Sequence, residues 1–337
     1  MRQSVVIRAD GGHQIGTGHL ARMFCLADRL QHSGCRVTFV SHLSDGCAAL
    51  CEARGHGLIL LPPVSHGSSA HAASAVCALG PHLILNDIRD TSSDYMRLLR
   101  NTGAQIVNFD DRGAGAELAD FLVDANRLPE EANEVVHPRV LFGPDYIVLS
   151  ETFEQLHRQP KVHRDHVEEL LIFMGGGDPA GLTRRALEGL EPTWHTTVVL
   201  GYAFRERLEV EALAAQWSNV EVVMGAHDLG ARMQQADLAL CSGGIAMFEL
   251  ACVGTPSVVW CQVPHELPNA RLLEKRGIVR CVGLADEPTV ESVARTLRAL
   301  ADDAPARRAM SEAGKRTVDG QGLNRVMEAI EQCVPQS

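Results

Sequence analysis

The chain has 337 residues, enough for two domains, and its 45% apolar and 22% charged residues are typical of a globular protein. A formal net charge of −11 argues against a broad surface for nucleic acid or anionic lipid, because both require dense Lys and Arg. The sequence has neither a run of 18 apolar residues nor a leader pattern at its start, so we expect a cytoplasmic protein without membrane or nucleic-acid partners.

The first predicted elements are a strand and a helix joined by a glycine-rich loop. Ser4 to Ile7 form an apolar run, and apolar residues recur at helical spacing from Leu20 onward. The loop contains Gly16 and Gly18, and His19 falls in the first turn of the helix. Free N–H groups of that turn suit a bound ligand, on which an imidazole can act. A tight turn with a surface histidine is the alternative interpretation.

Strand-like runs alternate with helical patterns along the whole chain, which predicts parallel sheets covered by helices. We therefore expect an α/β protein of two doubly wound domains, 1–157 and 158–337, separated by a polar segment near 156–167 and sharing a ligand cleft at the carboxyl ends of both sheets. The clearest predicted strands span 4–8, 36–40, 58–61, 83–85, 105–109, 170–174, 196–200, 220–223, 238–241, 257–260 and 279–282.

Two more glycine-rich loops open helices in the second half. Gly175-Gly176-Gly177-Asp178-Pro179 and Ser242-Gly243-Gly244 each follow a predicted strand. The first of these matches neither the dinucleotide fingerprint nor the P-loop. A helix N-terminus reached through glycines is a seat for phosphate, although a plain turn explains the Gly175 loop nearly as well. We expect Ser242 to cap its helix.

Glu249 lies less than two turns into the helix that follows Ser242. A carboxylate in such an apolar helix either faces solvent or accepts hydrogen bonds from a neutral ligand, such as ribose hydroxyls. The apolar neighbours Ile245, Phe248 and Cys252 favour the second interpretation.

The ten cysteines are expected to be reduced thiols of the core, as is usual in the cytoplasm. Cys47 and Cys51 have the spacing of two ligands on one helix face, but zinc requires a second close pair. We therefore predict neither a metal nor another cofactor.

Several ordered motifs together resemble the UDP-sugar hydrolases of the pseudaminic acid pathway and the related spore-coat polysaccharide biosynthesis proteins. The motifs are Arg8-Ala9-Asp10, Ile15-Gly16-Thr17-Gly18-His19-Leu20-Ala21-Arg22, Phe109-Asp110-Asp111-Arg112-Gly113, Phe142-Gly143-Pro144-Asp145-Tyr146, Phe173-Met174-Gly175-Gly176-Gly177-Asp178-Pro179 and Ser242-Gly243-Gly244. The resemblance covers nearly the whole chain. It implies the GT-B fold and hydrolysis of UDP-2,4-diacetamido-2,4,6-trideoxy-β-L-altropyranose to UDP and the free sugar.

The resemblance also implies residue roles. His19 matches the catalytic histidine of that family, where it would activate water for attack opposite the leaving UDP, with inversion. Asp87 and Asp111 follow the predicted strands at 83–85 and 105–109 and are candidates to orient His19 or to contact the sugar. The candidate substrate-binding residues are Gly16, Gly18, Arg22, Arg89, Gly176, Gly177, Asp178, Ser242, Gly243, Gly244, Glu249, His265, Glu266 and Asn269. The first domain would be the catalytic, sugar-side domain and the second the UDP-binding domain.

A GT-B glycosyltransferase is the alternative. The segment from His265 to Glu274 resembles the donor-sugar motif of the enzyme that adds N-acetylglucosamine to the lipid-linked peptidoglycan precursor, with Glu266 in place of the usual glutamine. The first half is itself acidic, which argues against a lipid acceptor but leaves a soluble one open. A nucleotide-sugar-binding protein without catalysis is the third possibility. The exact sugar and the oligomeric state are left open.

Overall fold

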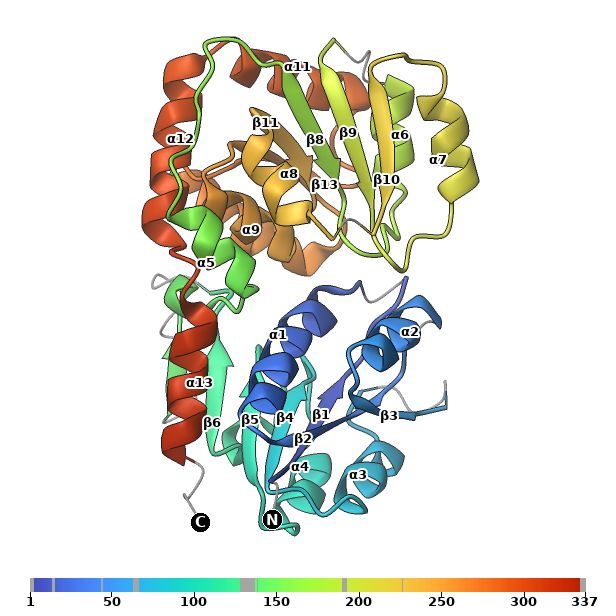
Figure 1. Ribbon diagram of the computed structural model, residues 1–337, viewed down its shortest axis with the longest axis vertical. Coiled ribbons are helices and arrows are strands. Elements are labelled where there is room, and N and C mark those ends of the chain that lie inside the picture. The colour runs from blue at the N-terminus through green and yellow to red at the C-terminus, as the bar shows by residue number, and fades with distance from the viewer. Residues whose placement is uncertain are drawn as a thin grey trace. The chain divides into compact units, whose positions relative to one another are not determined.

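The computed structural model describes residues 3–13, 16–43, 45–62, 67–127, 137, 139–189, 193–225 and 227–333. The chain divides into two compact units, each built on one parallel sheet (Figure 1). The first unit comprises Met1–Ile15, His19–Ser150 and Gln321–Ser337, and the second comprises Gly16–Gly18 and Glu151–Gly320. In the described part of the chain, no helix has the length and apolar character needed to cross a membrane.

The sheet of the first unit has seven strands in the order β3-β2-β1-β4-β5-β6-β7, and every neighbouring pair is parallel. Its strands are β1 (Ser4–Ala9), β2 (Arg36–Ser41), β3 (Gly57–Leu60), β4 (Leu83–Asp87), β5 (Gln105–Phe109), β6 (Phe121–Asp124) and β7 (Val140–Phe142). The first five are the predicted strands, and β6 and β7 extend the sheet beyond them. The helices of this unit are α1 (Gly18–His32), α2 (Asp45–Ala53), α3 (Ala70–Cys77), α4 (Ser93–Arg100), η1 (Ala116–Leu118), η3 (Pro144–Tyr146) and α13 (Gly322–Cys333).

The inner strands β1, β4, β5 and β6 are buried on both faces of this sheet, which is why they are mostly apolar runs. Val6 and Ile84 point to one face, where they form a core with α3 and α4. The opposite face holds Phe39, whose ring lies 5.2 Å from that of Phe24 on α1. Alternation of side chains along each strand thus anchors α1 on one face and α3 with α4 on the other.

The sheet of the second unit has six parallel strands in the order β10-β9-β8-β11-β12-β13. Its strands are β8 (Glu169–Phe173), β9 (His195–Leu200), β10 (Val220–Met224), β11 (Leu238–Cys241), β12 (Ser257–Cys261) and β13 (Arg280–Leu284). All six coincide with predicted strands. Its helices are α5 (Glu151–His157), α6 (Leu182–Gly189), α7 (Arg207–Ala214), α8 (Leu229–Gln235), α9 (Ile245–Val253), η4 (Pro264–Glu266), α10 (Leu267–Lys275), α11 (Val290–Ala301) and α12 (Ala304–Thr317).

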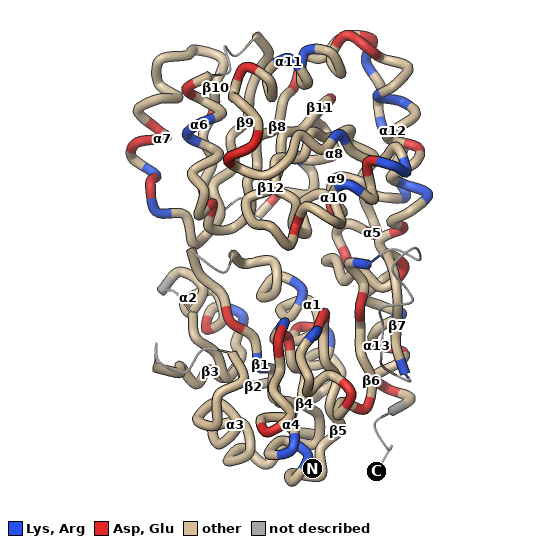
Figure 2. Tube along the Cα trace, turned by 180° about the vertical axis from the view of Figure 1, so that it is seen from behind, with Lys and Arg blue, Asp and Glu red and all other residues tan. Residues whose placement is uncertain are grey.

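The largest core cluster described in this unit joins the sheet to α6, α7 and α11. Trp260 of β12 is fully buried in it, and the guanidinium of Arg185 lies 4.6 Å from the centre of its ring. In the view of Figure 2, basic and acidic residues are interspersed along the traces of both units.

The extents of the two compact units differ in part from the domains predicted from the sequence, 1–157 and 158–337. The first unit ends at Ser150, before the predicted 157, because α5 packs against α8 and α9 of the second unit. The last segment, Gln321–Ser337, belongs to the first unit, since α13 packs against η3. The predicted second domain, 158–337, therefore lacks its final helix and gains α5.

Both sheets reverse their strand order beside their first strand, between β1 and β4 and between β8 and β11. In open α/β sheets, ligands bind outside the carboxyl ends of the strands at this switch point. The candidate residues lie near these strand ends: Asp87 is the last residue of β4, and His19 lies in the first turn of the helix that follows β1. Gly176 and Ser242 lie in the loops that follow β8 and β11.

Candidate active site

His19 lies in the first turn of α1, as predicted from the apolar periodicity. The loop reaches this turn through Gly16, whose φ of 79° is a left-handed conformation that favours glycine. The His19 side chain is 29% exposed, so a ligand can reach it.

His19 is held by Asp87, the last residue of β4. Its Nδ1 lies 2.7 Å from Oδ1 of Asp87, whose side chain is fully buried. A carboxylate can only accept a hydrogen bond, so Nδ1 carries a proton, and in the neutral ring the lone pair is therefore on Nε2. Asp87 therefore contacts the ring that is predicted to act as the base, and its role in catalysis stays a prediction.

Arg22 fixes Asp87 from the same helix face as His19, three residues along α1. Its Nε donates to Oδ2 of Asp87 at 2.6 Å, and a terminal nitrogen donates to Oδ1 at 2.6 Å. Its other terminal nitrogen donates to Asp110. The Arg22 side chain is only 7% exposed, and its donors are directed at these carboxylates. This geometry gives Arg22 a position from which it holds Asp87, and its predicted substrate contact stays a prediction.

The charges of this cluster stabilise one another. Burial alone would raise the pKa of Asp87, but Arg22 and His19 outweigh it and lower that pKa to about 2. Burial likewise opposes the charge of Arg22, and the carboxylates of Asp110 and Asp87 raise its pKa above the ordinary value. Asp87 is therefore ionised in the folded protein at neutral pH.

Asp110 is a site residue that the sequence reasoning missed. It directly follows β5 with a φ of 48°, and Arg22 and Asn126 both donate to its Oδ2. Its Oδ1 is buried without a hydrogen-bond partner among the described residues. The signal available in the sequence was the pair Asp110-Asp111 after a strand, of which only the second was chosen.

Asp111, the predicted alternative partner of His19, faces a different network. It accepts hydrogen bonds from the backbone N–H groups of Thr91 at 3.0 Å and Gly113 at 2.9 Å. The Thr91 hydroxyl and the Asn108 amide donate to its Oδ2 at 2.5 and 2.6 Å. Four donors from the surrounding loops saturate this carboxylate, so it holds those loops together and makes no described contact with His19.

The motif Arg8-Ala9-Asp10 at the end of β1 is also structural. The Arg8 guanidinium is completely buried and pairs with Asp10 through both terminal nitrogens. Asp10 in turn accepts the backbone N–H of His42 at 2.8 Å. This pair ties together the loops that follow β1 and β2.

In the second unit, Asp178 caps α6. Its Oδ1 accepts the N–H of Leu182 at 2.9 Å and its Oδ2 that of Thr183 at 2.7 Å. The carbonyl of Gly176 accepts the N–H of Ala203 at 3.0 Å, and Gly177 lies in the same turn. Because Asp178 occupies two free donors of this helix, the Gly175 loop is a poorer phosphate seat than predicted.

The N-terminus of α9 is more open. The cap residue is Gly244, with no side-chain cap, so the buried Ser242 does not cap the helix as predicted. Oε2 of Glu266 accepts the N–H of Gly243 at 3.2 Å and that of Gln262 at 2.8 Å. A Cβ atom at position 243 would lie only 2.7 Å from the Cβ of Glu266, which is too close for any residue other than glycine.

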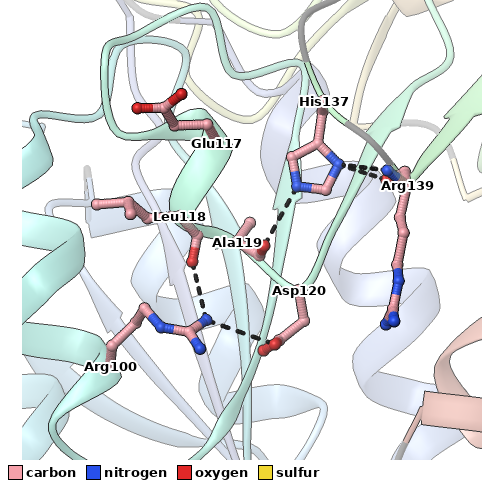
Figure 3. Close-up of a pocket in the computed structure, with 7 residues that line it drawn as sticks. All are labelled: Arg100, Glu117, Leu118, Ala119, Asp120, His137 and Arg139. Carbon is pink, nitrogen blue, oxygen red and sulfur yellow. Dashed lines mark hydrogen bonds and ion pairs between the residues drawn. The ribbon is translucent and has the colours of Figure 1, made fainter.

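Among the remaining candidates, Arg89 is half-buried after β4, His265 is exposed on η4, and Asn269 is half-buried on α10. A cavity of about 430 Å³ lies elsewhere, at the amino ends of β6 and β7 (Figure 3). Its polar groups bond to one another: Arg100 donates to Asp120, and His137 contacts the backbone of Ala119 and Arg139. It lies away from the carboxyl edge that positions His19.

Glu249 lies on α9 among buried neighbours, and burial raises its pKa to about 7. The carboxyl group of Glu249 therefore binds its proton more tightly in the folded chain than in the unfolded chain, where its pKa has the ordinary value of 4.5. The ionised carboxyl consequently destabilises the fold increasingly as pH rises from 4.5 to 7, and fully above that.

We expect Glu249→Gln to raise the melting temperature at pH 8 by a few degrees, with a much smaller gain at pH 5. Thermal denaturation at both pH values measures this. Glu331→Gln, an exposed position on α13, is the control and should change neither value. An unchanged melting temperature of Glu249→Gln at pH 8 would show that this carboxyl is solvated.

No family model matches the chain. It is 25% identical over 340 residues to the spore coat polysaccharide biosynthesis protein SpsG of Bacillus subtilis, covering 97% of each chain. It is 23% identical over 273 residues to the uncharacterized protein MJ1062 of Methanocaldococcus jannaschii, covering 76% of this chain and 55% of that protein. The predicted resemblance to spore-coat polysaccharide biosynthesis proteins is thus supported, whereas the assignment to pseudaminic acid hydrolases stays a prediction.

Solved glycosyltransferase structures share the fold. MurG of Acinetobacter baumannii has a TM-score of 0.65 at 16% identity, covering 98% of this chain and 99% of that one. The spinosyn forosaminyltransferase SpnP has a TM-score of 0.68 at 14% identity, covering 100% of both chains. These likenesses confirm the predicted GT-B class of two parallel-sheet α/β units, and at such identities they show the fold alone.

Proposed function

We propose that this chain is a nucleotide-sugar hydrolase that cleaves the glycosyl–UDP bond by attack of water at the anomeric carbon. Its products would be UDP and a free 2,4-diacetamido-2,4,6-trideoxy hexose, used to make a nonulosonic acid or a surface polysaccharide. The observation that carries the proposal is the His19–Asp87 pair, which leaves Nε2 of an accessible imidazole unprotonated. Similarity to SpsG supports a role in polysaccharide synthesis.

His19 acts as the general base in this proposal. Nε2 takes a proton from water as its oxygen bonds to the anomeric carbon, while the bond to the UDP oxygen breaks. General-base catalysis by a positioned side chain contributes about 10²- to 10⁴-fold in rate. Asp87 stabilises the imidazolium that forms, and Arg22 keeps Asp87 in place.

The second unit supplies the nucleotide site in this proposal. The uncapped N-terminus of α9 offers free N–H groups and a partial positive charge to the diphosphate. Glu249, one turn further along α9, is the candidate acceptor for ribose hydroxyls. No step of this mechanism calls on a metal ligand from the chain.

A GT-B glycosyltransferase is the second candidate, favoured by the glycosyltransferases that share the fold. The same His19–Asp87 pair can deprotonate an acceptor hydroxyl as well as water. The two functions therefore differ in the nucleophile, and the chemistry of the base is the same.

Incubation with UDP-linked diacetamido sugars, without any acceptor, distinguishes the two. The hydrolase proposal predicts steady release of UDP and of the inverted free sugar, followed by NMR before the anomers equilibrate. Turnover that begins only when an acceptor is added would identify a transferase. UDP binding without turnover under either condition would leave a nucleotide-sugar-binding protein.

Glu266 provides a test of the nucleotide site. Its carboxylate occupies the N–H of Gly243 and would repel a diphosphate at the N-terminus of α9. Glu266→Gln keeps a hydrogen-bond acceptor and removes the charge, so we expect UDP to bind about tenfold more tightly by calorimetry. Weaker UDP binding by this variant would contradict a diphosphate site at the N-terminus of α9. It would instead make Glu266 a ligand-binding group, as the sequence suggested.

A further inference from the structure

Three arginines follow consecutive strands of the first sheet at the edge that holds Asp87. Arg89 follows β4, Arg112 follows β5 and Arg127 follows β6, and these strands are neighbours in the sheet. The backbone N–H of Arg112 donates to the carbonyl of Arg89 at 2.7 Å, which joins the first two loops. In a chain of net charge −11, this edge therefore has a local concentration of guanidinium groups.

Most charges at this edge already have partners. Nε of Arg127 lies 3.3 Å from the carboxylate of Asp124, and Asp110 is bonded to Arg22. In contrast, the side chains of Arg89 and Arg112 make no hydrogen bond or ion pair with any residue that the structure describes. Arg112 is exposed and Arg89 is half-buried, so the donors of Arg89 have lost part of their water without gaining a partner.

Electrostatics makes this arrangement costly without a counter-ion. Burial lowers the pKa of Arg89, the charges of Arg112 and Arg127 lower it further, and Asp110 and Asp124 offset this only in part. A planar guanidinium offers a fork of donors that matches the oxygens of carboxylates and phosphates. An oxyanion would therefore satisfy these donors and neutralise the repulsion together.

We propose that Arg89 and Arg112 bind an oxyanion, a carboxylate or a phosphate, of the ligand on which His19 acts. Arg89 is two residues from Asp87, so the anion site lies beside the proposed base. The anion site is inferred from the two guanidinium groups alone, whereas the identification of the anion as part of the substrate rests on the proposed function. The proposed diacetamido sugar is neutral, so the group bound there is either the diphosphate of the nucleotide sugar or, in a transferase, an acidic group on the acceptor.

Titration with inorganic phosphate, and separately with acetate, tests the site at an ionic strength held constant with chloride. The His19 ring resonances are followed by NMR in histidine-labelled protein and assigned with His19→Ala. We expect a saturable shift in the unmodified chain and affinity about tenfold weaker in Arg89→Gln and in Arg112→Gln. Arg97→Gln, an exposed α4 residue paired with Asp94, should bind phosphate as the unmodified chain does.

Repeating the phosphate titration with UDP present separates the two sources. Competition between UDP and phosphate at the arginines assigns the site to the diphosphate, and additive binding assigns it to an acidic group on the acceptor. The proposal is overturned if the unmodified chain gives no saturable shift, if Arg97→Gln loses affinity equally, or if folded Arg112→Gln binds phosphate normally. Failure of the proposed function would appear instead as missing UDP release, and leaves this titration unaffected.

Discussion

Replacing His19 by Ala lowers kcat by about 10²- to 10⁴-fold and leaves UDP affinity nearly unchanged, if His19 is the general base. The reason is geometric: Nε2 is the unprotonated nitrogen of an accessible ring, and its neighbour Nδ1 is bound to Asp87 at 2.7 Å. Initial rates of UDP release and calorimetric UDP binding measure the two quantities.

His32→Ala is the matched control, because His32 is exposed at the other end of α1, where its Nδ1 contacts the backbone carbonyl of Asp28. It should keep the full rate. Added imidazole should restore part of the activity of His19→Ala, since the lost group is a base. Full activity of His19→Ala would remove this residue from the mechanism.

Asp87→Asn lowers kcat by a similar factor of about 10²- to 10⁴-fold for a different reason. An asparagine amide can donate to Nδ1 of His19, which moves the ring proton to Nε2 and removes the basic lone pair. Steady-state rates across pH measure the effect. The loss should persist at every pH, whereas a merely structural role would affect stability and leave the pH profile unchanged.

The same substitution reduces stability. The difference between a pKa of about 2 in the folded chain and the ordinary 3.8 corresponds to about 2 kcal/mol. This stabilisation is fully present above about pH 4 and is lost as pH falls through 2, because the unfolded chain then binds the proton more tightly. Asp111→Asn is the control: it removes a buried acceptor, so denaturant unfolding should detect a loss of stability while kcat stays near that of the unmodified chain.

The strands and the place of His19 follow from local patterns in the sequence. Continuous apolar runs can be recognised because both sheet faces are buried, and the spacing from Leu20 onward fixes the start of α1. Asp87 could be predicted because parallel strands end at one edge of a sheet. The strands β6 and β7 contain apolar runs of only three residues, Phe121-Leu122-Val123 and Val140-Leu141-Phe142, which are short for a strand prediction. The return of α13 to the first unit depends on tertiary packing.

The contacts of single side chains were harder to predict. Asp110 and Asp111 are adjacent in the sequence, yet the left-handed backbone at Asp110 directs one carboxylate to Arg22 and the other to Thr91. Ser242 has the usual chemistry of a cap, but the cap position is Gly244, two residues later, and α9 begins at Ile245. Both outcomes depend on backbone angles, which residue type predicts only weakly.

Hydrolysis of a UDP-linked diacetamido sugar in ¹⁸O-labelled water tests the central claim most directly. If His19 activates water for attack at the anomeric carbon, the label enters the free sugar at that carbon, UDP carries none, and His19→Ala slows both products equally. Label in the terminal phosphate of the released UDP would instead show that water attacked phosphorus and that the phosphorus–oxygen bond was cleaved. That result, or no release of UDP until an acceptor is added, would contradict the account.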